Sequence, residues 1–195
     1  MRQQWLHLVV VSAGLTPALS LVWRAAFGDL GANPIEEITH ETGECALRLL
    51  LLTLAVTPVR QLLGWRRIAP FRRTLGLLTF SYASLHLATF FVLDLGLDLS
   101  AFGEEVIERP YITAGLTAFT LLVPLAVTST RGWMRHLGRR WVTLHRLIYP
   151  AAIAATVHFW WLVKADLTEP IIYATLLALL LALRLPPALQ SRKKA

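Results

Sequence analysis

Residues 72–90 read RRTLGLLTFSYASLHLATF, and from Thr74 to Leu93 no charged side chain interrupts the sequence. An uncharged stretch of about 18 residues or more is typical of a membrane-spanning helix. Three further stretches carry at most one charged residue: Gln3–Trp23, Pro110–Thr130 and Trp141–Val163. Two weaker segments contain Arg48 and Arg184 near an end, where a long side chain can reach the membrane interface.

These segments predict an all-α integral membrane protein, a six-helix transmembrane bundle forming one domain over residues 1–195. The expected spans are about 5–26, 45–60, 74–94, 110–130, 141–163 and 170–187. The first is too long and uncharged for a signal peptide, so we expect it to be an uncleaved helix. No internal repeat is evident.

Composition excludes several other classes of protein. Hydrophobic residues make up 55% of the 195 residues, and charged residues only 16%, against about 25% in soluble domains. Disordered chains are poor in apolar residues, and a disulfide scaffold needs more than the single Cys45. The net charge of +7 would suit nucleic acid, but apolar blocks of this length indicate a lipid bilayer as the surroundings instead.

Charge is segregated between alternate connections. Every acidic residue lies in one of three connections, at 28–44, 94–110 and 164–169. The other connections and the tails hold 15 of the 19 basic residues and no acidic ones: Arg2, Arg60, Arg66, Arg67, Arg72, Arg73, Arg131, Arg135, Arg139, Arg140, Arg146, Arg184, Arg192, Lys193 and Lys194. The positive-inside rule places this basic side, and so both termini, in the cytoplasm.

Two histidines lie at matching depth in different spans. His86 is roughly 12 Å from the outer end of the third span, and His158 is roughly 9 Å from the outer end of the fifth. A b-type heme with two axial histidines needs two neutral imidazoles facing each other across one iron. The alternative is that both are packing residues hydrogen-bonded across helices. No CxxCH motif for covalent attachment is present.

A third histidine, His145, lies nearer the inner end of the fifth span. It is roughly 20 Å along the helix from His158, a separation that would suit a second heme. On a straight helix the two side chains point about 140° apart. Pro150 lies between them and can kink the helix, so spacing alone does not give them one face.

The stretches 72–90, 109–130 (RPYITAGLTAFTLLVPLAVTST) and 138–161 (GRRWVTLHRLIYPAAIAATVHFWW) resemble the ferric-reductase-like transmembrane domain. They resemble most closely its MsrQ branch, the heme-binding membrane subunits of bacterial protein-methionine-sulfoxide reductases. The resemblance implies an inner-membrane subunit that takes electrons from the quinone pool. It would pass them through heme to a periplasmic molybdenum-containing reductase that repairs methionine sulfoxide in envelope proteins. It also implies possible FMN binding, and it identifies His86, His145 and His158 as the heme-associated histidines.

One departure concerns the inner site. In the two-heme ferric-reductase pattern the third span carries a second histidine 13–14 residues before the first, where this chain has Arg73 and Arg72. Arginine does not readily replace imidazole on iron. An inner heme would therefore be five-coordinate or use another ligand, or the site would hold quinone or flavin. Arg72 and Arg73 would then neutralise heme propionates or a flavin phosphate, and Arg48 would face a propionate of the outer heme. The alternative for Arg72 and Arg73 is that they only keep this end of the span on the inner side of the membrane.

The chain lacks GxGxxG and GxxxxGK motifs, so we expect electrons to come from a membrane quinol or another polypeptide. The acidic connections 28–44 and 94–110 are either a docking surface or ordinary solvated loops. Two other functions compete: a stand-alone membrane ferric reductase, and a cofactor-free transporter or assembly factor. A catalytic methionine sulfoxide reductase is not expected, because Cys45 lies at the start of a span rather than in an exposed reactive position.

Overall fold

The computed structural model describes residues 2–184, and within that range the chain is helical, with no strand. Residues 185–187 of the expected sixth span, and Arg192, Lys193 and Lys194, lie outside the described residues. The elements in chain order are α1 (Arg2–Phe27), α2 (Pro34–Leu63), η1 (Arg66–Ile68), α3 (Phe71–Ala88), η2 (Thr89–Asp94), α4 (Leu99–Glu108), α5 (Pro110–Val127), α6 (Arg131–Leu137), α7 (Arg139–Leu144), η3 (His145–Leu147), α8 (Ile148–Leu162) and α9 (Thr168–Ala182).

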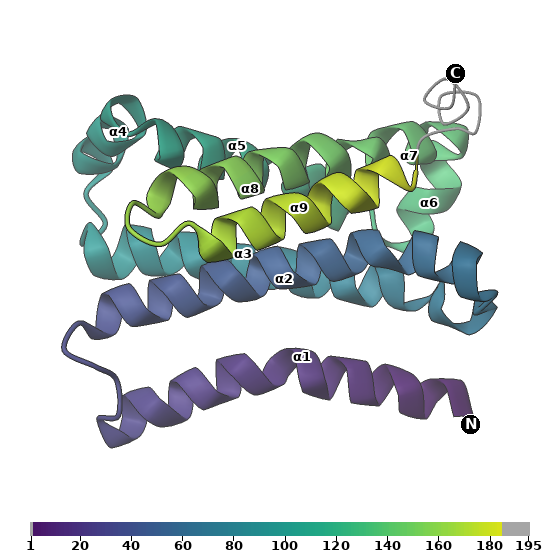
Figure 1. Ribbon diagram of the computed structural model, residues 1–195, viewed down its shortest axis with the longest axis horizontal. Helices are drawn as coiled ribbons and strands as arrows, with labels where there is room; N and C mark the ends of the chain where they lie inside the picture. Colours follow the sequence, from purple (N-terminus) through teal and green to yellow (C-terminus); the bar gives the residue numbers. More distant parts are fainter. Residues whose placement is uncertain (1, 185–195) are drawn as a thin grey trace.

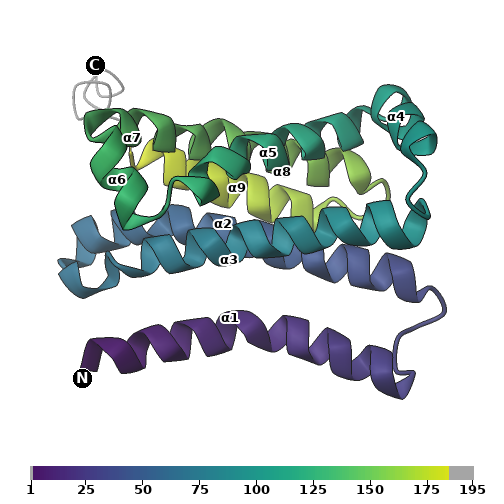
Figure 2. The ribbon, with the colours of Figure 1, turned by 180° about the vertical axis from the view of Figure 1, so that it is seen from behind.

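Two helix pairs form the centre of the bundle: α2 packs along α3, and α5 packs along α8 (Figures 1 and 2). The α9 helix lies against α8 and α2, and α1 lies on the outside against α3 and α2. Leu50 and Leu54 of α2 and Ala151 and Ala152 of α8 are at most 2% exposed. Small alanines on α8 let the two pairs approach closely, so the core sits where the pairs meet.

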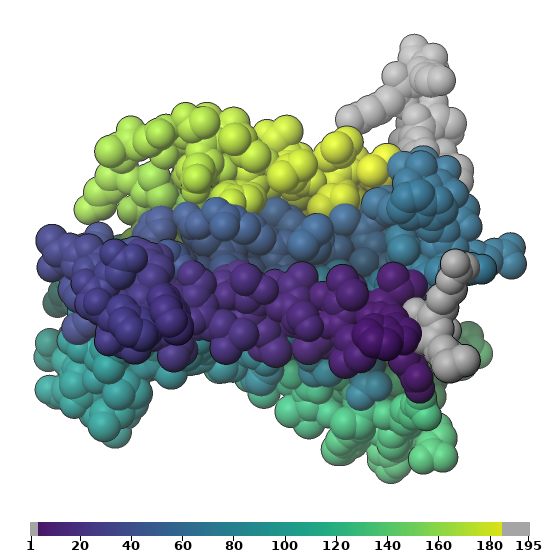
Figure 3. All heavy atoms as spheres, turned by 90° about the horizontal axis from the view of Figure 1, so that it is seen from below, coloured from purple at the N-terminus to yellow at the C-terminus, as the bar shows by residue number. Residues whose placement is uncertain are grey.

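The outermost helix, α1, is fastened to α3 by a tyrosine. The Tyr82 hydroxyl donates to the Gly14 carbonyl at 2.7 Å and accepts from the Ala18 amide at 3.1 Å. The hydroxyl is thus inserted between a carbonyl and an amide four residues apart, which normally bond each other in an α-helix. Pro17, which has no backbone N–H, lies beside this interruption. Figure 3 shows α1 lying across this face of the bundle, and its outer side chains such as Trp5 and Leu19 are exposed, as expected of a helix facing lipid.

The α2 helix begins well before the expected span 45–60. Pro34 occupies its first turn, the Asn33 side chain accepts from the Glu36 amide, and Gly64 ends the helix with φ of 67°. The expected connection 28–44 is therefore a loop only up to Asn33, and its remaining acidic residues extend α2 beyond the apolar region. Among the side chains that the structure describes, all four arginine–carboxylate pairs and the His40–Glu44 contact lie at this acidic end, and two of the pairs join Arg24 of α1 to Glu37 and Glu41.

Four helical stretches are long and apolar enough to cross a membrane: Gln4–Phe27, Pro34–Leu63, Arg66–Asp94 and Pro110–Val127. The expected span 141–163 is broken into α7, the 3₁₀ turn η3 and α8. Pro150 explains the break, because it has no N–H to bond the carbonyl four residues earlier. The α9 helix, with 15 residues, is only about 22 Å long. The fold is thus a membrane helical bundle. Six spans and cytoplasmic termini remain predictions, although the start of α1 and the end of α9 lie at the same end (Figure 1).

Candidate functional site

A cavity of about 680 Å³ lies between α2, α3, α5 and α8. Most of its lining is apolar, including Leu50, Phe90 and Phe159, and no residue of α1 or α9 contributes to it. Charged residues line it only toward the acidic end: Glu36, Glu44, Asp94, Arg109 and Lys164. This combination of an apolar body with a few charges at one end is typical of a cofactor site.

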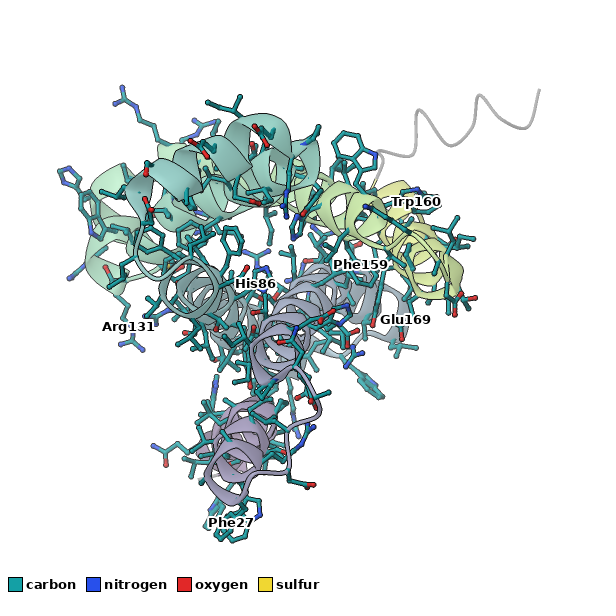
Figure 4. All side chains as sticks on the ribbon, turned by 90° about the vertical axis from the view of Figure 1, so that its left-hand side faces the viewer. Phe27, His86, Arg131, Phe159, Trp160 and Glu169 are labelled. Carbon is teal, nitrogen blue, oxygen red and sulfur yellow. The ribbon has the colours of Figure 1, made fainter. Side chains whose placement is uncertain are left out.

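His86 of α3 and His158 of α8 face each other inside this cavity. Their ring centroids are 6.0 Å apart and their planes are inclined by 75°. Figure 4, viewed along the bundle from its acidic end, shows His86 and Phe159 inside the ring of helices and Trp160 outside it. The structure therefore brings together the two histidines that the sequence placed at similar depth.

Each of the two imidazoles is fixed by a backbone carbonyl of the neighbouring helix. Nδ1 of His86 lies 2.8 Å from the Thr39 oxygen, and Nδ1 of His158 lies 2.6 Å from the Tyr111 oxygen. A carbonyl oxygen only accepts, so Nδ1 must carry the proton in both rings. Both Nε2 atoms are then lone-pair donors, the arrangement that metal-ligating histidines adopt.

Glycines make room for both rings. A Cβ atom placed on Gly43 of α2 would lie 2.9 Å from Nδ1 and Cε1 of His86. One placed on Gly115 of α5 would lie 2.9 Å from Nδ1 of His158. Each glycine stands one helical turn after the residue whose carbonyl holds the ring, so any larger residue would displace an imidazole from its hydrogen bond.

This geometry fits one metal atom held between the two rings. A metal–imidazole nitrogen bond is about 2.0–2.1 Å, so two rings on opposite sides of one metal have centres about 6 Å apart. Among residues 2–184 no group of three or more His, Cys, Asp or Glu side chains could hold an ion. The remaining coordination positions would have to come from the cofactor itself, as in a heme, and Arg109 and Lys164 are the arginine and lysine of the lining that could pair with its carboxylates.

His145 is not part of this cavity. It lies in η3, stacked on Trp141 at a centroid distance of 3.8 Å, with Nδ1 3.1 Å from the carbonyl oxygen of the same tryptophan. Its Nε2 is buried and has no hydrogen-bond partner among residues 2–184. It therefore marks a separate polar position nearer the basic end.

The three predicted arginines are not among the residues that line the cavity, although Arg48 pairs with the lining residue Glu44. Arg48 is exposed and bonds Tyr173 of α9 at 2.8 Å and Glu44 at 2.5 Å. Arg72 and Arg73 are exposed at the start of α3, and Arg72 lines a small cleft with Arg60. None of them is placed beside the His86–His158 pair, so as cofactor partners they remain predictions.

Sequence reasoning missed six residues of the site: Thr39 and Tyr111 with their carbonyls, the glycines Gly43 and Gly115, and the cations Arg109 and Lys164. One signal was present. The hydrogen-bonded pairs Thr39–His86 and Tyr111–His158 are both 47 residues apart, and each first residue is followed four positions later by glycine. The α2–α3 and α5–α8 pairs thus share one arrangement around their histidines.

Comparison with known proteins places the chain in a family. Residues 42–156 match the family described as ferric reductase like transmembrane component. The chain is 57% identical to a protein-methionine-sulfoxide reductase heme-binding subunit MsrQ of Xanthomonas campestris pv. campestris (strain B100), over 84% of this chain and 75% of the relative. It is 50% identical to the MsrQ of Xanthomonas axonopodis pv. citri (strain 306), over 95% and 88%, and 51% identical to that of Rhodospirillum rubrum, over 90% and 86%. The chain therefore belongs to the MsrQ family of ferric-reductase-like transmembrane proteins.

Proposed function

We propose that the protein is a heme b-containing electron-transfer subunit of the bacterial inner membrane. It takes electrons from the quinone pool and passes them to a periplasmic molybdopterin-type methionine sulfoxide reductase that repairs oxidised envelope proteins. The observation that carries the proposal is the pair of imidazoles 6.0 Å apart, each with Nδ1 held by a carbonyl. The names of the relatives, heme-binding subunits of such a reductase, support it.

The residues of the cavity have separate tasks in this proposal. His86 and His158 would hold the iron through Nε2, and the apolar lining from α2, α3, α5 and α8 would exclude water around it. Arg109 and Lys164 neutralise carboxylates at the acidic end. Heme bound there supplies a carrier that accepts and releases one electron at a time.

The overall reaction balances with quinol as donor. Quinol releases two electrons and two protons as it becomes quinone. Reduction of one methionine sulfoxide to methionine consumes two electrons and two protons and forms one water. A one-electron carrier must therefore be reduced and oxidised twice for each sulfoxide repaired, and the protons need not pass through the cavity.

We infer the topology from charge. With the basic end in the cytoplasm, α7–η3–α8 forms a broken fifth span and α9 a short sixth, and both termini are cytoplasmic. His158 then lies four residues, about 6 Å, before the end of α8 on the periplasmic side. The imidazole pair is close enough to that surface for delivery to a periplasmic partner.

For the cytoplasmic half we propose quinol oxidation beside His145, whose Nε2 is buried and lacks a partner among residues 2–184. A second heme or FMN would suit the same position. Chemical analysis of the purified protein distinguishes these three occupants. A second heme doubles the heme content, and FMN gives a flavin that acid releases. A quinol site predicts one heme per chain and no flavin.

The test is a dithionite-reduced minus oxidised spectrum of the detergent-purified protein, beside His86→Ala and His158→Ala. We expect a b-type α-band in the wild type that is lost in both variants. His136→Ala is the matched control, because His136 is an exposed histidine outside the cavity. Wild-type protein without a heme band, made with ample heme, would refute the proposal and favour a cofactor-free transporter or assembly factor.

The match to ferric-reductase-like proteins favours one second candidate, a stand-alone metal reductase. The two functions differ in their acceptor. We expect the reduced protein to transfer electrons to the periplasmic reductase much faster than to chelated ferric ion. The reverse order would establish the metal reductase.

A further inference from the structure

The arrangement around the two histidines is built twice, once in each helix pair. On α2, Thr39 offers its carbonyl to His86 and Gly43 clears space for the ring. On α5, Tyr111 and Gly115 do the same for His158. We call each carbonyl with its glycine a cradle: the Thr39/Gly43 cradle and the Tyr111/Gly115 cradle.

Each cradle constrains its ring in two ways. The carbonyl fixes the direction of the Nδ1–H bond and therefore the tautomer. The glycine lets the ring lie against the helix at a distance that a Cβ, at 2.9 Å from ring atoms, would forbid. An imidazole has no flexible end that could bend aside, so a methyl group at this position would displace the whole ring. Without such contacts, rotation about χ2 of histidine is broad.

We propose that the two cradles are positioning elements that hold the ligand planes of His86 and His158 nearly perpendicular and keep both Nε2 atoms available to one iron. The interplanar angle of 75° follows from two rings that are fixed independently by different helix pairs. This inference rests on the proposed heme-binding function and goes beyond it, because it assigns what sets the electronic character of the site.

Two physical consequences follow. Perpendicular axial imidazole planes leave two iron d orbitals nearly degenerate, which gives a highly anisotropic low-spin EPR signal when the iron is ferric. Parallel planes split these orbitals and give a rhombic signal. In addition, an Nδ1–H bond to a carbonyl makes the imidazole a stronger donor, which favours ferric iron and lowers the midpoint potential.

The first test uses the unmodified full chain. We expect oxidised, heme-loaded wild-type protein to give the highly anisotropic low-spin EPR signal. A rhombic low-spin spectrum would overturn the inference while leaving the heme function intact. A protein that binds no heme at all would instead refute the proposed function, so the two failures are distinguishable.

The second test removes each cradle separately. Gly43→Ala and Gly115→Ala should each move the largest g value and raise the midpoint potential, because the displaced ring weakens its carbonyl bond. Gly76→Ala on α3 is the matched control, since its Cβ would meet only Thr53 Cγ2 at an ordinary 3.8 Å. The inference is overturned if both cradle variants keep the wild-type EPR spectrum and potential. Heme loss from folded cradle variants but not from Gly76→Ala would support it, and if they fail to fold, the wild-type spectrum decides.

Discussion

The acidic and basic halves of the bundle each contain a histidine of the segment 141–163, but the two histidines lie in different surroundings. His158 reaches across to a carbonyl of α5 and faces a second imidazole. His145, thirteen residues earlier, bonds the carbonyl of Trp141 in its own helical segment and stacks on that ring. The position corresponding to His145 on α3, thirteen residues before His86, is the exposed Arg73. In this chain the acidic half therefore holds the better-built ligand pair, because a neighbouring helix orients each ring toward the other.

The largest expected effect separates these two halves. We expect His86→Ala and His158→Ala to abolish the b-type heme, because one imidazole alone holds the iron weakly. His145→Ala should keep the heme of the acidic half and lose rapid reduction by quinol. Heme content by the pyridine hemochrome method, and heme reduction after mixing with quinol, measure the two effects. Loss of all heme in His145→Ala would show that the acidic half does not bind its heme independently of the basic half.

A smaller effect is expected from the charged lining. Replacing Arg109 or Lys164 by Gln removes a positive charge near the acidic end of the cavity, which disfavours the reduced state. The midpoint potential should fall by on the order of 20 mV for a partly solvated charge. Arg66→Gln is the control, because Arg66 is an exposed arginine of η1 that does not line the cavity. A redox titration in which only Arg66→Gln shifts would show that the wrong cations have been assigned.

The link between α1 and the rest of the bundle should affect stability but not the spectrum. Tyr82→Phe removes one hydroxyl that bonds both Gly14 and Ala18. The free energy of unfolding should therefore fall by about 0.5–1.5 kcal/mol. Thermal unfolding in detergent measures this loss. The EPR spectrum of bound heme should not change, since α1 contributes no residue to the cavity. An altered heme signal would mean that α1 shapes the site.

The smallest expected effect concerns α4 at the acidic end. The Ser100 hydroxyl and the amides of Ala101 and Ser100 donate to Asp98, and these bonds hold the pKa of its carboxyl below the usual value. The ionised Asp98 carboxylate therefore stabilises α4 fully when the pH is above the ordinary pKa of aspartate. This stabilisation is lost as the pH falls through the lowered pKa. The protection of α4 amides against hydrogen exchange, taken relative to the intrinsic exchange rate at each pH, should therefore fall in acid. Asp98→Asn, which caps without titrating, should remove that dependence.

Hydropathy and charge predicted much of the bundle but not the details of its site. The apolar runs and the segregation of charge indicated a membrane bundle, and helical rise placed His86 and His158 at one depth. The start of α2 at Pro34 was missed because acidic residues there resemble a loop. The cradles were missed because a carbonyl and a glycine act through the rotation and register of two packed helices, which periodicity along one helix does not encode. The 47-residue spacing of both pairs was the available signal.

The central claim is that His86 and His158 bind the same iron from opposite sides. Near-infrared magnetic circular dichroism of the oxidised, heme-loaded protein tests it most directly, because the charge-transfer band of low-spin ferric heme identifies its axial ligands. We predict the band of a bis-imidazole heme in the wild type, and its absence in His86→Ala and His158→Ala. A five-coordinate heme in the wild type, or a bis-imidazole band that survives either substitution, would contradict the claim.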